Sequence, residues 1–188
     1  MTDRREMTAA EIAALTRRID RPVVLVGLMG AGKSTVGQRL ANLMDSDFVD
    51  SDAEIEAAAQ RSVSEIFEQF GEPYFRDGER RVIARLIEEG HGVLATGGGA
   101  FVQPETRALI LERAIAVWLD CDIDTLLART RRRDTRPLLR GGDPKEILAR
   151  LHAERAPAYA EAPIRIETGD LPHHLTAQRI LEAIDQWL

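Results

Sequence analysis

The chain has 188 residues, enough for one domain with its own hydrophobic core, and its 44% hydrophobic and 30% charged composition excludes a disordered protein. The net charge of −6 argues against a nucleic-acid-binding protein, which usually carries a basic surplus. The single cysteine, Cys121, excludes an internal disulfide, and no apolar run approaches the roughly 18 residues of a membrane span. We therefore expect a cytoplasmic protein that binds neither nucleic acid nor membrane.

Residues 1–21 are expected to form an extension in front of a single domain that covers residues 22–188. Within it, the segment "TAAEIAALTRRI" would place Ile12, Leu15 and Ile19 on one side of a short helix. We expect this segment to be loosely docked and to carry no chemistry.

Five short apolar segments predict strands, and helical patterns fill the intervals between them. A continuous β-branched run such as "PVVLVG" is typical of a strand buried on both faces. Strands that alternate with helices indicate right-handed crossovers and a parallel sheet with helices on both of its faces. The predicted strands are 22–27, 46–50, 92–99, 115–120 and 164–168. The predicted helices are 33–44, 52–70 in two pieces, 73–89, 104–113, 122–132, 144–160 and 173–187.

The segment "GLMGAGKST", residues 27–35, matches the phosphate-binding pattern G-x-x-x-x-G-K-[ST] and lies between a predicted strand and a predicted helix. Its glycines let consecutive backbone N–H groups point at an anion, and the following helix adds its dipole. In such loops the lysine reaches the β- and γ-phosphates and the hydroxyl after it binds Mg²⁺. We expect ATP phosphates on Gly30, Ala31, Gly32, Lys33, Ser34 and Thr35, and Mg²⁺ on Ser34.

Two further segments fall at the carboxyl ends of predicted strands, where parallel α/β sheets bind their ligands. Asp50 and Asp52 follow the second strand, where one carboxylate would face magnesium through water and the other a substrate hydroxyl. Asp52 could instead cap the helix that begins there. The three glycines 97–99 end the third strand and would let a ligand approach the backbone closely.

Three basic features complete the candidate site. Arg76 lies in the first turns of a predicted helix in "GEPYFRDGE", and Arg155 precedes Ala-Pro, where Pro157 would bend or interrupt a helix and aim the arginine at the cleft. The segment "RTRRRDTRPLLRGGD", residues 129–143, is a basic, glycine-punctuated loop. Such a run could be a solvated face or a nucleic-acid patch. As a functional element, it would act as a lid over nucleotide phosphates.

The segments "GLMGAGKSTVGQRLA", "FVDSDAEIE", "GEPYFRDGE", "ATGGGA", "TRPLL" and "ERAPAYAE", in this order, resemble the shikimate kinase family. The resemblance covers about residues 22–187. It implies a P-loop α/β fold of the nucleoside-monophosphate-kinase type, with five parallel strands in the order 2-3-1-4-5. It also implies substrate-binding helices over about 51–90, a lid over about 130–143, and ATP-dependent phosphorylation of the 3-hydroxyl of shikimate.

The resemblance also assigns roles to individual residues. Asp52 would hydrogen-bond the ring hydroxyls of shikimate, Arg76 and Arg155 would bind its carboxylate, and Gly98, between Gly97 and Gly99, would supply a backbone contact. Planar guanidinium groups match a planar carboxylate, which supports the two arginines on physical grounds.

On the nucleotide side, the family pattern places Arg136 of the lid on the phosphates, Arg129 against adenine and Asp50 in the outer shell of magnesium. Lys33, Asp52 and Arg136 would therefore be the catalytic residues, with Asp52 either taking the hydroxyl proton or only orienting the hydroxyl. The region "TGDLPHHL" departs from the family because it lacks an arginine near adenine.

Two alternatives remain open at this point. A gluconate-kinase-like enzyme would share the loop and the lid, and a P-loop nucleotide switch would bind nucleotide without phosphorylating a metabolite. We expect small-molecule partners only, shikimate and ATP, and a monomeric protein.

Overall fold

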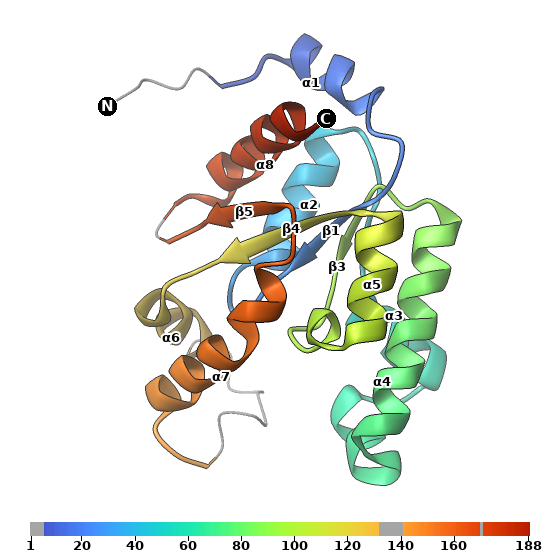
Figure 1. Ribbon diagram of the computed structural model, residues 1–188, viewed down its shortest axis with the longest axis vertical. Coiled ribbons are helices and arrows are strands. Elements are labelled where there is room, and N and C mark those ends of the chain that lie inside the picture. The colour runs from blue at the N-terminus through green and yellow to red at the C-terminus, as the bar shows by residue number, and fades with distance from the viewer. Residues whose placement is uncertain (1–5, 132–140, 170) are drawn as a thin grey trace.

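The sheet of the computed structural model, which describes residues 6–131, 141–169 and 171–188, consists of five parallel strands (Figure 1). Their order is β2-β3-β1-β4-β5, as the sequence analysis expected. The central strand pairs on both sides, with Val23 opposite Val93 of β3 and Ile115 of β4. The bounds are Val23–Val26 for β1, Phe48–Asp50 for β2, Val93–Ala95 for β3, Ile115–Asp120 for β4 and Ile164–Glu167 for β5.

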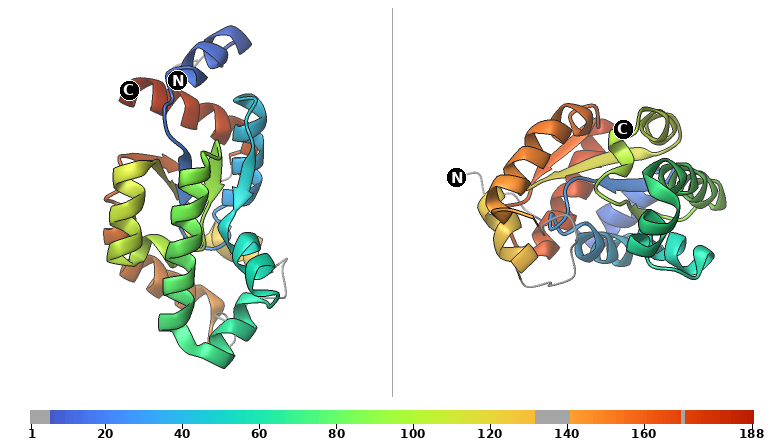
Figure 2. Two further views of the ribbon diagram at one scale, coloured as in Figure 1. Left: turned by 90° about the vertical axis from the view of Figure 1, so that its right-hand side faces the viewer. Right: turned by 90° about the horizontal axis from the view of Figure 1, so that it is seen from below.

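Helices cover both faces of this sheet, as expected for right-handed crossovers between parallel strands (Figure 2). α2 and α8 pack together on one face, and α4 and α5 lie on the other. α6 and α7 pack against each other beside the carboxyl ends of the strands. The helices are α1 Ala9–Thr16, α2 Lys33–Leu43, α3 Ser51–Ala59, α4 Val63–Glu89, α5 Pro104–Arg113, α6 Ile123–Arg131, α7 Pro144–Tyr159 and α8 His173–Trp187, with a short 3-10 turn, η1, at Ala100–Val102.

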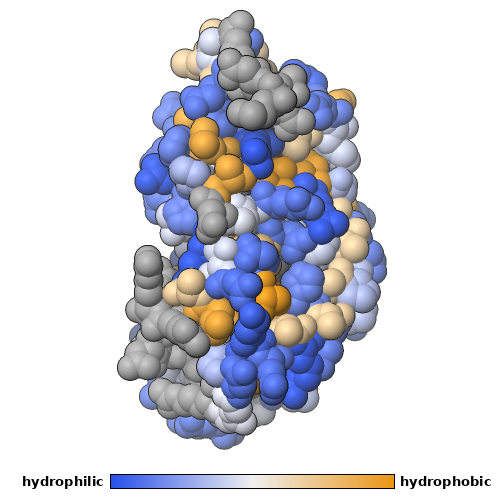
Figure 3. Space-filling view, turned by 90° about the vertical axis from the view of Figure 1, so that its left-hand side faces the viewer, coloured by the Kyte–Doolittle hydropathy of each residue, from blue (hydrophilic) through white to orange (hydrophobic). Residues whose placement is uncertain are grey.

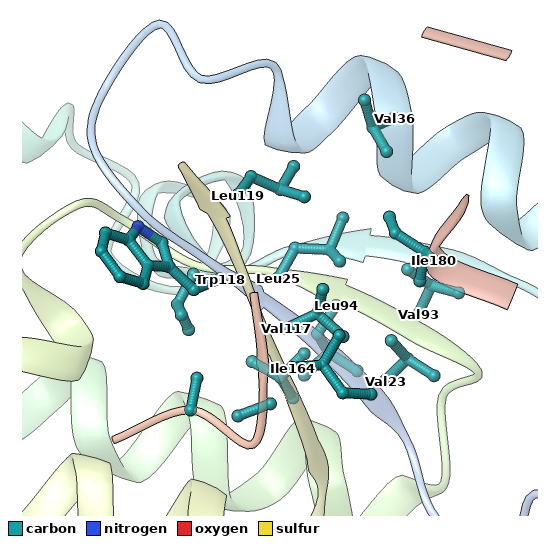
Figure 4. Close-up of a cluster of buried hydrophobic side chains, with 14 of the residues drawn as sticks. Val23, Leu25, Val36, Val93, Leu94, Val117, Trp118, Leu119, Ile164 and Ile180 are labelled. Atoms are coloured by element: carbon teal, nitrogen blue, oxygen red, sulfur yellow. The ribbon is translucent and has the colours of Figure 1, made fainter. Parts of the chain in front are cut away.

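The core lies between the sheet and these helix layers. Val23, Leu25 and Val117 on the central strands are fully buried, and Val36 of α2 and Ile180 of α8 close over them (Figure 4). Burial on both faces explains why these strands read as continuous apolar runs. β5 alternates buried and exposed residues instead, as an edge strand with one solvated face does.

The surface that carries α6, α7, α8 and the edge of the sheet is largely hydrophilic, with apolar residues in small separate groups (Figure 3). No helix of the described residues is long and apolar enough to cross a membrane.

The amino-terminal segment is packed more closely than the sequence analysis expected. α1 begins at a capping box between Thr8 and Glu11, and it buries Ile12 and Leu15 in the main core. Arg18 pairs with Asp185 of α8, which joins the segment to the last helix. The apolar side of this helix therefore covers core surface, and α1 is not a loose extension.

The substrate-side helices break where the sequence indicated. α4 begins at a capping box of Ser62 and Glu65, and Gly71 interrupts it with a left-handed φ of 80°. Arg76 therefore lies in the turns that follow this break, on the segment that runs back toward the sheet.

α7 is shaped by one residue at each of its ends. Asp143 caps the helix by accepting a hydrogen bond from the backbone N–H of Lys145. Pro157 does not interrupt the helix, which continues to Tyr159, because a proline in the last turn removes only one backbone hydrogen bond. Of the predicted lid, residues 132–140, with Arg136, lie outside the described residues.

Candidate active site

The phosphate-binding loop leaves β1 and enters α2, as predicted. Gly27 has a φ of 136°, and a Cβ there would lie 2.5 Å from the carbonyl oxygen of Leu119, so both backbone and space require glycine. Gly32, with a φ of 92°, occupies the N-cap position of α2 and has no side chain to cap the helix. The N-terminus of α2, with the positive end of its dipole, thus lies at the loop, where it favours an anion.

Lys33 and Ser34 lie at the start of α2 and face the loop and β2. The Lys33 ammonium donates to the carbonyl oxygens of Gly27 and Leu28, at 2.7 and 2.8 Å. The Ser34 hydroxyl donates to Asp50 Oδ2 at 2.8 Å. The hydroxyl and carboxylate oxygens of this pair are ligand types that suit a hard cation such as Mg²⁺.

The helix α3 is capped by Asp50 and not by Asp52, which was the alternative role for Asp52. Asp50 is the N-cap of α3 and accepts a hydrogen bond at 3.0 Å from the backbone N–H of Asp52. Asp52 therefore does not cap the helix, and its carboxylate lies against Gly97. Burial raises the pKa of Asp52, the negative charge of Asp50 adds to that effect, and Lys33 and Arg76 oppose it.

Each of the three glycines after β3 makes room for a different charged side chain. A Cβ at Gly97 would lie 2.8 Å from Asp52 Oδ1. A Cβ at Gly98 would lie 3.3 Å from Arg155 Nη1, and a Cβ at Gly99 would lie 2.7 Å from Arg76 Cζ. The glycine segment thus brings together three predicted site residues from α3, α4 and α7.

Arg76 is held by a partner that the sequence analysis missed. Its Nη1 donates to Glu79 Oε2 at 2.7 Å, and its guanidinium lies 5.2 Å from the ring centroid of Phe75. Glu79 is only 1% exposed, and burial raises its pKa to about 7. Its other oxygen, Oε1, has no hydrogen-bond donor among the described residues and lies toward Gly97. The sequence does carry a signal for this pair, because residues three apart on a helix lie side by side.

The side of the loop away from Asp52 carries Arg129 and His173. Arg129 Nη2 donates to the carbonyl oxygen of Gly169 at 3.0 Å, and Nη1 lies 3.4 Å from that of Ala31. The His173 ring lies beside Gly32, and burial, followed by the positive charges of Arg129 and Arg39, lowers its pKa. His173 was not among the predicted site residues. It lies in the segment "TGDLPHHL", which has no arginine near the expected adenine position.

The structure thus gathers the predicted residues at one edge of the sheet. The phosphate-binding loop, the Ser34–Asp50 pair and the charged side chains at the glycine segment 97–99 lie together where β1, β2 and β3 end. Arg129 lies on the other side of the loop. Arg136 cannot be placed because it lies outside the described residues.

The strand order, the phosphate-binding loop and the charged side chains gathered beside it define a P-loop kinase of small molecules. The family model for shikimate kinase matches residues 29–185. The chain is 60% identical to a shikimate kinase of Novosphingobium aromaticivorans over 97% of its own length and 96% of that protein. It belongs to the shikimate kinase family.

Solved structures agree with this family assignment. A shikimate kinase from Acinetobacter baumannii in complex with shikimate is 39% identical, with a TM-score of 0.85 over 95% of this chain and 98% of that chain. A gluconokinase from Sinorhizobium meliloti is only 14% identical, with a TM-score of 0.59 over 90% of this chain and 94% of that chain, and it shares the fold alone.

Proposed function

We propose that the protein transfers the γ-phosphoryl group of ATP to the 3-hydroxyl of shikimate, forming shikimate 3-phosphate and ADP. The observation that carries this proposal is the packing of Asp52, Arg155 and Arg76 on the three successive glycines 97–99 beside the phosphate-binding loop. These side chains offer two guanidinium groups for a carboxylate and one carboxylate for hydroxyls, which matches a hydroxylated acid.

The donor side binds the phosphates of ATP. Backbone N–H groups of residues 30–35 and the N-terminus of α2 face the β- and γ-phosphates, and the Lys33 ammonium exchanges its two carbonyl partners for phosphate oxygens. Ser34 would bind Mg²⁺ directly, and Asp50 would bind it through water. When bound, the metal neutralises charge on the phosphate oxygens.

The acceptor side binds and orients shikimate. Arg76 and Arg155 hold the carboxylate, while Asp52 accepts a hydrogen bond from the hydroxyl that attacks. Glu79 holds Arg76 through Oε2, and its Oε1, which has no donor in the part of the chain that the structure describes, suits a second hydroxyl of the ligand. Because phosphoryl transfer depends mainly on positioning and charge neutralisation, this placement supplies much of the catalysis.

Several parts of the proposal rest on the sequence resemblance. Arg136 would meet the transferring phosphoryl group, and Arg129 would lie against adenine. The substrate-binding helices would cover about residues 51–90, and the lid about 130–143, within a domain of residues 22–188. We also propose a monomer that acts in the cytoplasm.

The test is acceptor-dependent formation of ADP. With ATP and Mg²⁺, the protein should release ADP rapidly when shikimate is added and only slowly without it, and gluconate should not replace shikimate. ADP release that needs gluconate would favour the gluconate-kinase alternative. Release that no acid changes would favour a nucleotide switch.

A further inference from the structure

Tyr159, the last residue of α7, is a buried side chain that the proposed mechanism does not use. It is 1% exposed, and its ring packs against Trp118 at 5.8 Å between centroids. Its hydroxyl donates a hydrogen bond to the carbonyl oxygen of Gly98, 61 residues earlier in the chain. Burial raises the pKa of this hydroxyl, so it remains a donor at neutral pH.

Gly98 is the point where donor and acceptor sides meet. A Cβ at this position would lie 3.3 Å from Arg155 Nη1, 3.5 Å from the backbone nitrogen of Met29 and 3.6 Å from the carbonyl oxygen of Gly27. The peptide that Tyr159 holds is therefore packed between the phosphate-binding loop and a carboxylate-binding arginine.

Tyr159 also shares this position with that arginine. Arg155 lies four residues earlier on the same side of α7, and its guanidinium approaches Gly98 as the tyrosine hydroxyl does. Its positive charge opposes the rise that burial causes in the pKa of the hydroxyl. The phenol and the guanidinium thus meet at the Gly98 peptide, where the hydroxyl donates to the carbonyl oxygen. On the same helix, His152 Nε2 lies 3.1 Å from Asp120 Oδ1, which attaches α7 to the end of β4.

We propose that Tyr159 is a positioning residue for the acid substrate, which holds the Arg155 guanidinium and the Gly98 peptide in the geometry that receives its carboxylate. A free arginine side chain loses considerable rotamer entropy when it binds a ligand, and the tyrosine removes part of that loss in advance. This inference rests on the proposed function, because it assigns the acid to Arg155.

The test is steady-state kinetics of Tyr159→Phe, which deletes the hydroxyl and keeps the ring beside Trp118. We expect the KM for shikimate to rise about tenfold, while the KM for ATP changes less than about twofold. The matched control is Thr16→Val, which deletes a hydroxyl that also donates to a backbone carbonyl, that of Ile12, on α1 at the far end of the molecule (Figure 1). The control should keep both KM values.

A second variant covers the case in which Tyr159→Phe does not fold. With 4-aminophenylalanine at position 159, an N–H still donates to Gly98, but the hydroxyl oxygen near the Arg155 guanidinium is lost. The shikimate KM should again rise several-fold with the folded state intact.

Three results would overturn the inference: a wild-type shikimate KM in the folded variant, an equal rise in the KM for ATP, or the same rise in Thr16→Val. If the unmodified protein does not phosphorylate shikimate, the proposed function fails instead.

Discussion

Replacing Gly99 with alanine should disable Arg76 without disturbing the backbone. Gly99 has a φ of −95°, which alanine adopts freely, so the change acts only through its methyl group. That methyl would lie 2.7 Å from Arg76 Cζ and 2.8 Å from Nη1, too close for the guanidinium to stay in place. The arginine must leave its contact with Glu79 and its position over the glycine segment.

The size of the effect follows from the bond that shikimate would lose. A hydrogen bond to a charged group contributes about 1.5–3 kcal/mol, which corresponds to a rise of about 10- to 150-fold in the Kd for shikimate. The affinity for ADP should change less than about twofold, because the atoms nearest to the new methyl group belong to Arg76 and not to the phosphate-binding loop.

Titration calorimetry with shikimate and, separately, with ADP measures both affinities. Gly78→Ala is the matched control: it changes the same residue type on α4, two positions from Arg76, where a Cβ meets nothing within 4 Å. It should keep the affinity for shikimate and stabilise the helix by about 0.5–1 kcal/mol. Unchanged shikimate binding in Gly99→Ala would refute the assignment of Arg76 to the carboxylate.

Three other changes test separate parts of the site. Lys33→Ala should abolish turnover while the far-ultraviolet circular dichroism spectrum stays that of the folded protein, because its charge is needed on the transferring phosphate; turnover near the wild-type rate would exclude a catalytic role for this loop. Arg155→Lys keeps the charge but loses the planar fork, so calorimetry should show shikimate binding weakened by roughly 1–3 kcal/mol and ATP binding retained; equal losses for both ligands would contradict its role. Glu79 has a native pKa of about 7 against an ordinary value of 4.5, so between these values the folded state holds a proton that the unfolded state releases, and stability falls as the pH rises. In urea unfolding, the free energy of unfolding of the wild type should fall by about 2 kcal/mol more than that of Glu79→Gln between pH 5 and pH 8. Equal falls in the two proteins would show that Glu79 does not titrate in this range.

The sheet was predictable because its signals are local. Continuous β-branched runs such as 22–27 are typical of strands buried on both faces, and β1, β3 and β4 are such strands. The strand order came from the resemblance to a known family, since periodicity alone does not order strands.

The polar contacts of the site were less predictable because they join distant segments. Glutamate in a helix is usually exposed, and Glu79 is buried only because α4 packs beside the glycine segment 97–99. Tyr159 reads as an ordinary core aromatic until its partner at Gly98 is known. The close packing of α1 was not predicted for a similar reason. The core surface that Ile12 and Leu15 cover is formed only when α8 is in place.

The central claim is that this site transfers phosphate to one hydroxyl of shikimate, and the product itself tests it most directly. Phosphorus NMR of a reaction that contains the protein, ATP, Mg²⁺ and shikimate should show ADP and a single phosphate monoester, with proton correlation that places the ester on the 3-hydroxyl. Inorganic phosphate as the only new product besides ADP, or an ester on another hydroxyl, would contradict the account.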